Sequence, residues 1–121
     1  MRLFTSLVIA FGLVGVAPHP AKAAEYCGYA SHYGVGDGYG GRTTASGEVM
    51  DPYAMTAASL DFPLKSKVRV TDQQTGKSVI VKINDRGPYY GGRVLDLSYG
   101  AFSQIRNPSR GETYVCLSRV N

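Results

Sequence analysis

Histidine and cysteine, the residues that hold most transition metals in proteins, are scarce in this chain of 121 residues, which has two of each. No cluster of Cys, His and Asp stands at the spacing of a metal site. The glycine-rich stretch GVGDGYGG, residues 34–41, does not connect a strand to the start of a helix, as a nucleotide-binding loop would. His32 has no G-x-S-x-G motif with which to form a Ser-His-Asp triad. We therefore predict no metal and no other cofactor.

Runs of like charge are also missing. Thirteen basic residues face 9 acidic ones, which gives a formal net charge of +4. Loss of Arg2 and Lys22 with a leader segment would leave 11 basic residues and a net charge of +2. Because no Lys/Arg run could follow a phosphate backbone, we expect no binding to nucleic acid. The small positive excess weakly suits an anionic polymer of a cell wall.

A long hydrophobic run occurs once, at residues 3–17, after Met1-Arg2. Ala21 and Ala23 follow it at positions −3 and −1 of a small-residue cleavage site, which predicts a Sec-type signal peptide over residues 1–23. The run is short for a membrane span, so an uncleaved anchor is the less favoured alternative. Cys27 follows Ala-Glu-Tyr and not the small residues of a lipobox, so we expect no lipid. The remaining residues, 24–121, are predicted to form one small, exported, monomeric domain with no stable membrane anchor.

The two cysteines lie near the two ends of this domain. An even number of cysteines in an exported chain favours a disulfide between Cys27 and Cys116, with two reduced thiols as the alternative. On the chain-entropy view, such a bridge would stabilise the domain by roughly 2–5 kcal/mol.

Helical patterns are few. Residues 51–60 allow one or two turns after Asp51, and residues 98–105 allow another after Ser98 as N-cap. Alternating or β-branched segments predict strands at 26–33, 67–71, 78–84, 93–97 and 113–120, with a hairpin turn at Gly76. Six glycines make residues 33–48 a long irregular loop. Many short strands and little helix predict an all-β fold, a small barrel.

Carboxylates are the remaining candidates for chemistry. In VIVKINDRGPYY, residues 79–90, Asp85 ends an apolar strand. Cleavage of a glycosidic bond needs a proton donor, and a rigid strand end favours Asp85 over Glu48 of the glycine-rich loop. Arg86 is expected to point away, because side chains alternate along a strand. The alternative for Asp85 is a turn-former or the partner of an arginine. Asp51, Asp61 and Asp96 are further candidates, of which Asp96 is expected rather to satisfy a loop backbone or an arginine.

Tyrosine rings could line a cleft for a sugar, because ring faces cover the apolar side of a pyranose. We expect about two of six candidates there and the others in ordinary packing. The candidates are Tyr29, Tyr33, Tyr39, Tyr53, Tyr89 and Tyr90.

Taken together, the motifs resemble the rare lipoprotein A (RlpA) family of lytic transglycosylases over residues 28–105. RTTASGE, MTAAS, FPLKSKVRV, VKINDRGPY and GRVLDLS stand in the order and spacing of that family. The resemblance implies a six-stranded double-psi β-barrel, an architecture that expansins share. It also implies a protein of the bacterial periplasm or exterior that binds peptidoglycan glycan strands. The implied reaction cleaves the β-1,4 bond between N-acetylmuramic acid and N-acetylglucosamine and leaves a 1,6-anhydro end.

The same resemblance implies roles for individual residues. Asp85 becomes the catalytic acid and then base, and Glu48 the second catalytic carboxylate. The family usually has TAAH where this chain has TAAS, so Ser59 replaces a histidine of the active site, and His32 is a candidate to take its place. The candidate substrate-binding residues are Ser59, Tyr33, Arg42, Arg86, Tyr89 and His32.

Two functions follow, and they stay open here. The first is a lytic transglycosylase that uses Asp85 and Glu48. The second is an expansin-like or degenerate barrel that binds wall glycan without cutting it, which the loss of the histidine at Ser59 favours. A role as an inhibitor or effector has no motif to support it.

Overall fold

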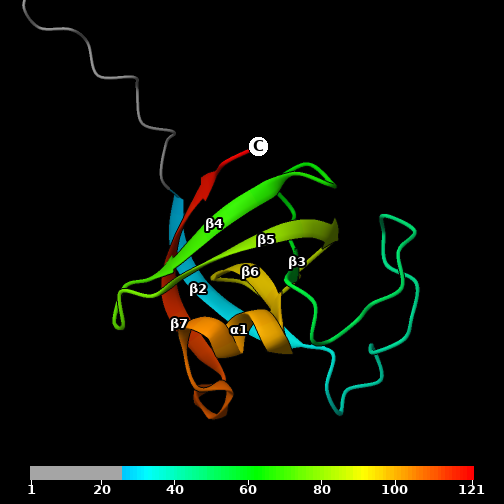
Figure 1. The fold of residues 1–121 in the computed structure, drawn as a ribbon, viewed down its shortest axis with the longest axis horizontal. Helices are drawn as coiled ribbons and strands as arrows, with labels where there is room; N and C mark the ends of the chain where they lie inside the picture. The colour runs from blue at the N-terminus through cyan, green and yellow to red at the C-terminus, as the bar shows by residue number, and fades with distance from the viewer. Residues whose placement is uncertain (1–25) are drawn as a thin grey trace, which may run out of the picture.

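The computed structural model describes residues 26–121, so the predicted signal peptide lies outside the described residues. Within them, six strands close into one barrel in the order β2-β6-β3-β5-β4-β7 (Figure 1). β2 pairs in parallel with β6, and β3 with β5, whereas the other neighbours are antiparallel. The strands are β2 (Tyr26–Tyr33), β3 (Thr56–Ala58), β4 (Lys67–Asp72), β5 (Ser78–Asp85), β6 (Arg93–Ser98) and β7 (Glu112–Arg119). The predicted all-β barrel is therefore confirmed.

Alternation along the strands fills the barrel. Val68 and Val70 of β4 are fully buried, while Lys67 and Arg69, which alternate with them, face solvent, as the sequence pattern predicts. The helix α1 (Tyr99–Ile105) packs its buried side chains against the same core. Ser98 caps α1 as predicted, because its hydroxyl accepts a hydrogen bond from the backbone N–H of Ala101 at 3.0 Å. A short 3₁₀ helix, η2 (Pro108–Arg110), then leads into β7. None of the helices in residues 26–121 has the length and apolar character needed to cross a membrane.

The helix predicted within residues 51–60 is wrong. Asp51 does cap a turn, since its carboxylate accepts from the N–H of Tyr53 at 2.9 Å. The chain then extends, and β3 inserts between β5 and β6 with all three of its residues buried. A central strand of three small residues has no exposed side chain and hence no alternation for a sequence pattern to reveal.

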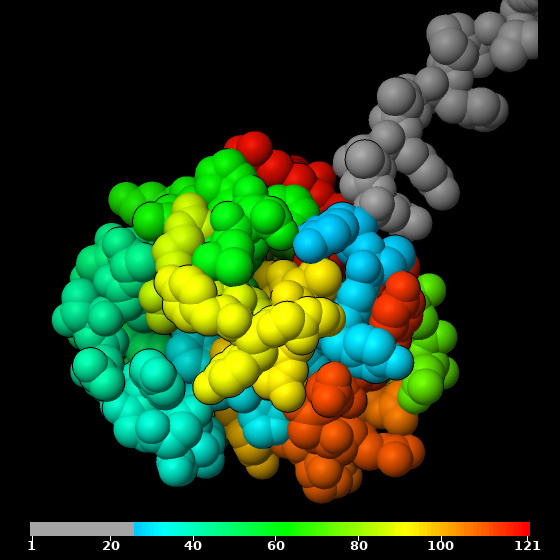
Figure 2. Space-filling view, turned by 180° about the vertical axis from the view of Figure 1, so that it is seen from behind, coloured from blue at the N-terminus to red at the C-terminus, as the bar shows by residue number. Residues whose placement is uncertain are grey.

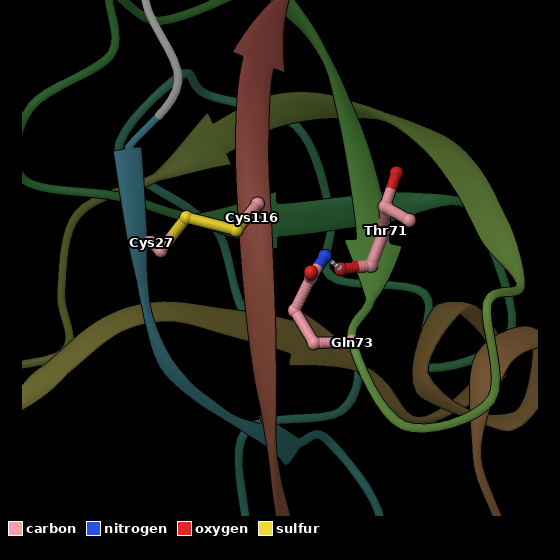
Figure 3. Close-up of a disulfide and its surroundings, with 4 residues drawn as sticks. All are labelled: Cys27, Thr71, Gln73 and Cys116. Carbon is pink, nitrogen blue, oxygen red and sulfur yellow. Dashed lines mark hydrogen bonds between the residues drawn. A yellow bond between two sulfur atoms is a disulfide. The ribbon is translucent and has the colours of Figure 1, made fainter.

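The disulfide is confirmed. Cys27 of β2 and Cys116 of β7 are directly opposed residues on neighbouring antiparallel strands, and their sulfur atoms are bonded (Figure 3). The bridge therefore links the first and the last described strands at the seam where the barrel closes.

Candidate active site

A groove of about 580 Å³ opens beside the ends of β2, β3 and β5. The glycine-rich loop after β2 forms one wall and the loop after β5 forms another. In Figure 2 the loop after β5 (yellow) stands between the glycine-rich loop (cyan) and β2 (blue), with a hollow between yellow and cyan. The polar and aromatic lining includes Ser31, His32, Tyr33, Asp37, Tyr39, Arg42, Asp85, Arg86, Tyr89, Tyr90, Arg93 and Asp96.

Asp85 is half-buried at the end of β5 and lines this groove. Its Oδ1 accepts hydrogen bonds from the N–H groups of Ala45 (3.0 Å) and Arg86 (2.9 Å), and its Oδ2 accepts from the hydroxyl of Tyr33 (3.0 Å). Burial, and then the charge of Asp85, raise the pKa of Tyr33 far above its usual range. The phenol therefore keeps its proton and remains a donor. Two loops and a strand thus fix both carboxylate oxygens.

The guanidinium of Arg86 does not pair with Asp85. Arg86 Nη1 instead donates to the carbonyl oxygens of Ser59 (2.6 Å) and Phe62 (2.7 Å). This agrees with the expectation that successive side chains diverge along the strand. The Asp85 carboxylate is therefore not neutralised by its neighbouring cation.

Asp96 lines the groove as well, whereas the sequence favoured a structural role for it over a catalytic one. Its Oδ1 accepts a hydrogen bond from the Ser31 hydroxyl at 3.0 Å. Burial raises the pKa of Asp96, although the Ser31 hydrogen bond and then the charges of Arg93 and His32 act in the opposite direction. One signal could have located this residue. If the strand at Thr56–Ala58 had been recognised, its antiparallel pairing with β6 would have placed Asp96 directly opposite Ala58.

Glu48 does not line the groove. Its carboxylate lies 2.5 Å from Lys82 Nζ and accepts a second hydrogen bond from Asn84 Nδ2 at 3.2 Å. These two hydrogen bonds, that of Lys82 first, lower the pKa of Glu48 below its ordinary value of 4.5. Its backbone carbonyl also accepts from the N–H and the hydroxyl of Thr44. The structure therefore joins Glu48 to β5 and to its own loop and does not bring it into one groove with Asp85.

Ser59 is also away from the groove. It is fully buried, and its hydroxyl accepts from the N–H groups of Asp61 and Phe62, both at 3.0 Å. The expectation that Ser59 contacts substrate is therefore corrected: its hydroxyl shapes the turn after β3. His32 does line the groove, and its Nε2 lies 2.9 Å from the carbonyl oxygen of Pro108. Because a carbonyl only accepts, Nε2 carries the proton of this hydrogen bond.

Aromatic and basic side chains form much of the exposed walls of the groove. Four of the six candidate tyrosines line the groove, which is more than the two expected, and Tyr89 and Tyr90 are 77% and 73% exposed. Arg42 lies 5.6 Å from the ring centre of Tyr39, and Arg93 lies at the same distance from that of Tyr90. Stacked cations and open rings of this kind can contact the faces and the anionic groups of a sugar chain. No group of three or more Cys, His, Asp or Glu residues within 26–121 could hold a metal ion.

Comparisons with known proteins agree with this geometry. The family model described as "Lytic transglycolase" matches residues 25–117. The endolytic peptidoglycan transglycosylase RlpA of Pseudomonas aeruginosa is 47% identical over 101 residues, which cover 84% of this chain and 29% of that protein. A probable endolytic peptidoglycan transglycosylase RlpA of a Nostoc species is 58% identical over 77 residues, 64% of this chain and 21% of that protein. This chain thus spans less than a third of the length of either relative.

Among solved structures, a Clavibacter michiganensis expansin variant in complex with cellohexaose has a TM-score of 0.65 at 20% identity, covering 81% of this chain and 51% of that one. A Streptomyces papain inhibitor has the same TM-score and identity, covering 83% and 97%. At such identity these two neighbours establish only the double-psi barrel fold. The family match and the RlpA relatives go further: the chain belongs to the lytic transglycolase family of double-psi β-barrel domains.

Proposed function

We propose that this domain is a peptidoglycan lytic transglycosylase that cuts glycan strands in the groove around Asp85. The observation that carries the proposal is the state of that carboxylate. Asp85 faces an open groove, three hydrogen-bond donors hold it, and the nearest cation in sequence, Arg86, is engaged elsewhere. The relatives, named as endolytic peptidoglycan transglycosylases, support the same substrate.

In its simplest form the reaction needs one carboxyl group. Asp85 donates a proton to the oxygen that links N-acetylmuramic acid to N-acetylglucosamine, and the bond from that oxygen to the anomeric carbon breaks. The 6-hydroxyl of the same muramic acid then attacks the anomeric carbon, and its proton passes to Asp85. The product carries a 1,6-anhydro ring, no water is consumed, and Asp85 is ready for another cycle.

The other predicted residues divide into two groups in this proposal. Tyr33, Arg42, His32 and Tyr89 line the groove and contact the glycan directly. Arg86 holds the turn after β3 through its two carbonyl acceptors, and so supports the floor of the groove.

Glu48 is proposed to act as a positioning residue. Its carboxylate binds Lys82 and Asn84 of β5, which docks the turn of residues 44–48 against the strand that ends in Asp85. The same turn supplies the Ala45 N–H that hydrogen-bonds Asp85 Oδ1. Loss of the Glu48 carboxylate would therefore slow the reaction indirectly, because Asp85 would be less well positioned.

The test is digestion of purified peptidoglycan glycan strands by the domain of residues 24–121, with the products identified by mass spectrometry. We expect 1,6-anhydro products from the wild type and from Asp61→Asn, an exposed carboxylate outside the groove that serves as the matched control. Asp85→Asn should release none while its melting temperature stays close to that of the wild type. Full activity of Asp85→Asn would remove this residue from the reaction.

A second function has one observation in its favour. Ser59 stands where the resembled family usually has a histidine, so this chain lacks a titratable group that the resemblance implies for the active site. This favours a barrel that binds wall glycan without cutting it. Retention of the domain on glycan strands with no product after long incubation would establish this function in place of the first. In either case we propose that the domain works outside the cytoplasm, in the periplasm or beyond.

A further inference from the structure

A row of four residues crosses the floor of the groove on four neighbouring strands. Ser31 of β2 is the register partner of Asp96 on β6, and Asp96 in turn is a partner of Ala58 on β3. Ala58 is also the partner of Asp85 on β5. All four line the groove, as directly opposed residues on neighbouring strands share one face of a sheet. Two carboxyl groups therefore flank Ala58 from opposite sides.

The spacing of this row leaves room for a reacting group. Neighbouring strands lie about 4.8 Å apart, so the backbones at Asp85 and Asp96 are separated by roughly 10 Å. Ala58 between them extends only a methyl group toward the groove. The two carboxyl groups therefore stand on opposite sides of a position that carries only a methyl group, and both line the same groove.

The two carboxyl groups differ in their surroundings. Both oxygens of Asp85 accept hydrogen bonds, from two backbone N–H groups and one phenol, which is the arrangement of a group that receives a proton. Asp96 accepts one hydrogen bond, from the Ser31 hydroxyl, and is half-buried, as Asp85 is. Burial raises the pKa of Asp96, which favours its protonated form.

Several charged or titratable groups face Asp96 from the elements around it. Arg93 on its own strand and His32 on β2 favour the ionised form, and Asp37 of the glycine-rich loop opposes it. The other titratable groups that line the same groove are Tyr33, Tyr39, Arg42, Asp85, Arg86, Tyr89 and Tyr90.

We propose that Asp96 is a second catalytic residue, the acid that protonates the glycosidic oxygen, while Asp85 serves as the base. The inference rests on the proposed function and divides between two residues the work that its simplest form gives to Asp85. The proton of Asp96 passes to the glycosidic oxygen as the bond to the anomeric carbon breaks. The 6-hydroxyl oxygen bonds to that carbon, and its proton passes to Asp85. Transfer of one proton from Asp85 to Asp96 through solvent restores both groups.

The experiment compares Asp96→Asn, Asp85→Asn, Ser31→Ala and the control Asp61→Asn on glycan strands, with kcat/KM followed from low to high pH. Asp96→Asn should lower kcat/KM about 100-fold or more, as expected when a general acid is removed. It should fold at least as well as the wild type at pH 7, since a neutral amide is buried in place of a carboxyl group that resists ionisation. A loss smaller than tenfold overturns the proposal.

Ser31→Ala supplies a readout that a structural role would not move. Activity that needs protonated Asp96 declines as the pH rises through the pKa of that group. The Ser31 hydrogen bond lowers this pKa, so its removal should move the alkaline limb of the pH profile to higher pH. An unchanged limb, or a downward shift, overturns the assignment even if Asp96→Asn fails to fold.

The outcomes also separate this inference from the function on which it rests. If the wild type releases no 1,6-anhydro product, the proposed function itself fails. If the wild type is active, Asp85→Asn is inactive and Asp96→Asn is active, the function stands and the single-carboxyl reaction replaces the inference.

Discussion

The ion pair between Glu48 and Lys82 gives a direct way to separate a positioning role from a chemical one. Both side chains are more than a third exposed, at 36% and 37%. A pair so open to solvent contributes only about 0.2–1 kcal/mol to the free energy of unfolding. We therefore expect Glu48→Gln and Lys82→Met each to lower the melting temperature by less than about 8 °C.

The expected effect on activity is larger than the effect on stability. The pair holds the turn whose Ala45 N–H hydrogen-bonds Asp85. Loss of one hydrogen bond to a charged acceptor costs about 1.5–3 kcal/mol, which corresponds to a rate lower by roughly 10-fold to 150-fold if it is lost outright. If Glu48 acts through the turn, the cleavage rates of both variants should be lower than that of the wild type, by a factor that approaches this range. The double variant should then be no worse than the single ones, because one interaction cannot be lost twice.

The assay is the rate of release of 1,6-anhydro products from glycan strands, with thermal melts of each variant as the stability control. A second readout is pH. Because the pKa of Glu48 is lowered on folding, its contribution to stability is present above its ordinary value of 4.5 and is lost as the pH falls through the folded pKa. The gap in melting temperature between the wild type and Glu48→Gln should therefore close in acid. A fully active Lys82→Met beside an inactive Glu48→Gln would refute the positioning role and assign Glu48 to the chemistry.

Three further outcomes are expected. The bridge between Cys27 and Cys116 closes a loop with a sequence separation of 89, so the double Cys→Ser variant should lose about 2–5 kcal/mol and melt at least about 8 °C lower; an unchanged melt would contradict this. Tyr33→Phe removes one of the three donors to Asp85 and should slow product release about tenfold or more with little change in melting temperature; an unchanged rate would leave the phenol without a role. Ser59→His forces a larger side chain into a fully buried site and should cost about 1–3 kcal/mol without raising activity, and a gain in rate at unchanged stability would show that the serine is a defect.

The sequence predicts every strand of this barrel except β3 well, because each of the others carries local signals. In β4, buried Val68 and Val70 alternate with exposed Lys67 and Arg69, and the predicted strand differs from the observed one by a single residue. Ser98 marks the start of α1 in the sequence, because its hydroxyl caps the helix. The order of family motifs adds the closed double-psi topology, which no local pattern could supply.

The contents of the groove were harder to predict, because they depend on pairing between distant segments. Asp96 stands between two leucines in sequence, and only its register opposite Ala58 and Ser31 brings it to the groove. Glu48 is the last residue of the glycine-rich loop in sequence, but the position of Lys82 on β5 determines where its carboxylate lies. Charge pairing and register are tertiary properties, so the sequence shows which groups are available and not which of them meet.

Ala58 explains why a short, weakly patterned strand is needed at the centre of this site. It stands between Asp85 and Asp96 and is almost fully buried while contributing to the groove floor. A larger side chain at this position would extend into the space between the two carboxyl groups, where the anomeric carbon and the 6-hydroxyl must lie in the proposed reaction. The small side chain of Ala58 therefore keeps the groove open, and the small side chains of β3 are also the reason that no sequence pattern predicts this strand. Under this argument Ala58→Leu should lose about 1–3 kcal/mol of stability through overpacking, and its affinity for glycan strands should fall together with its rate of cleavage.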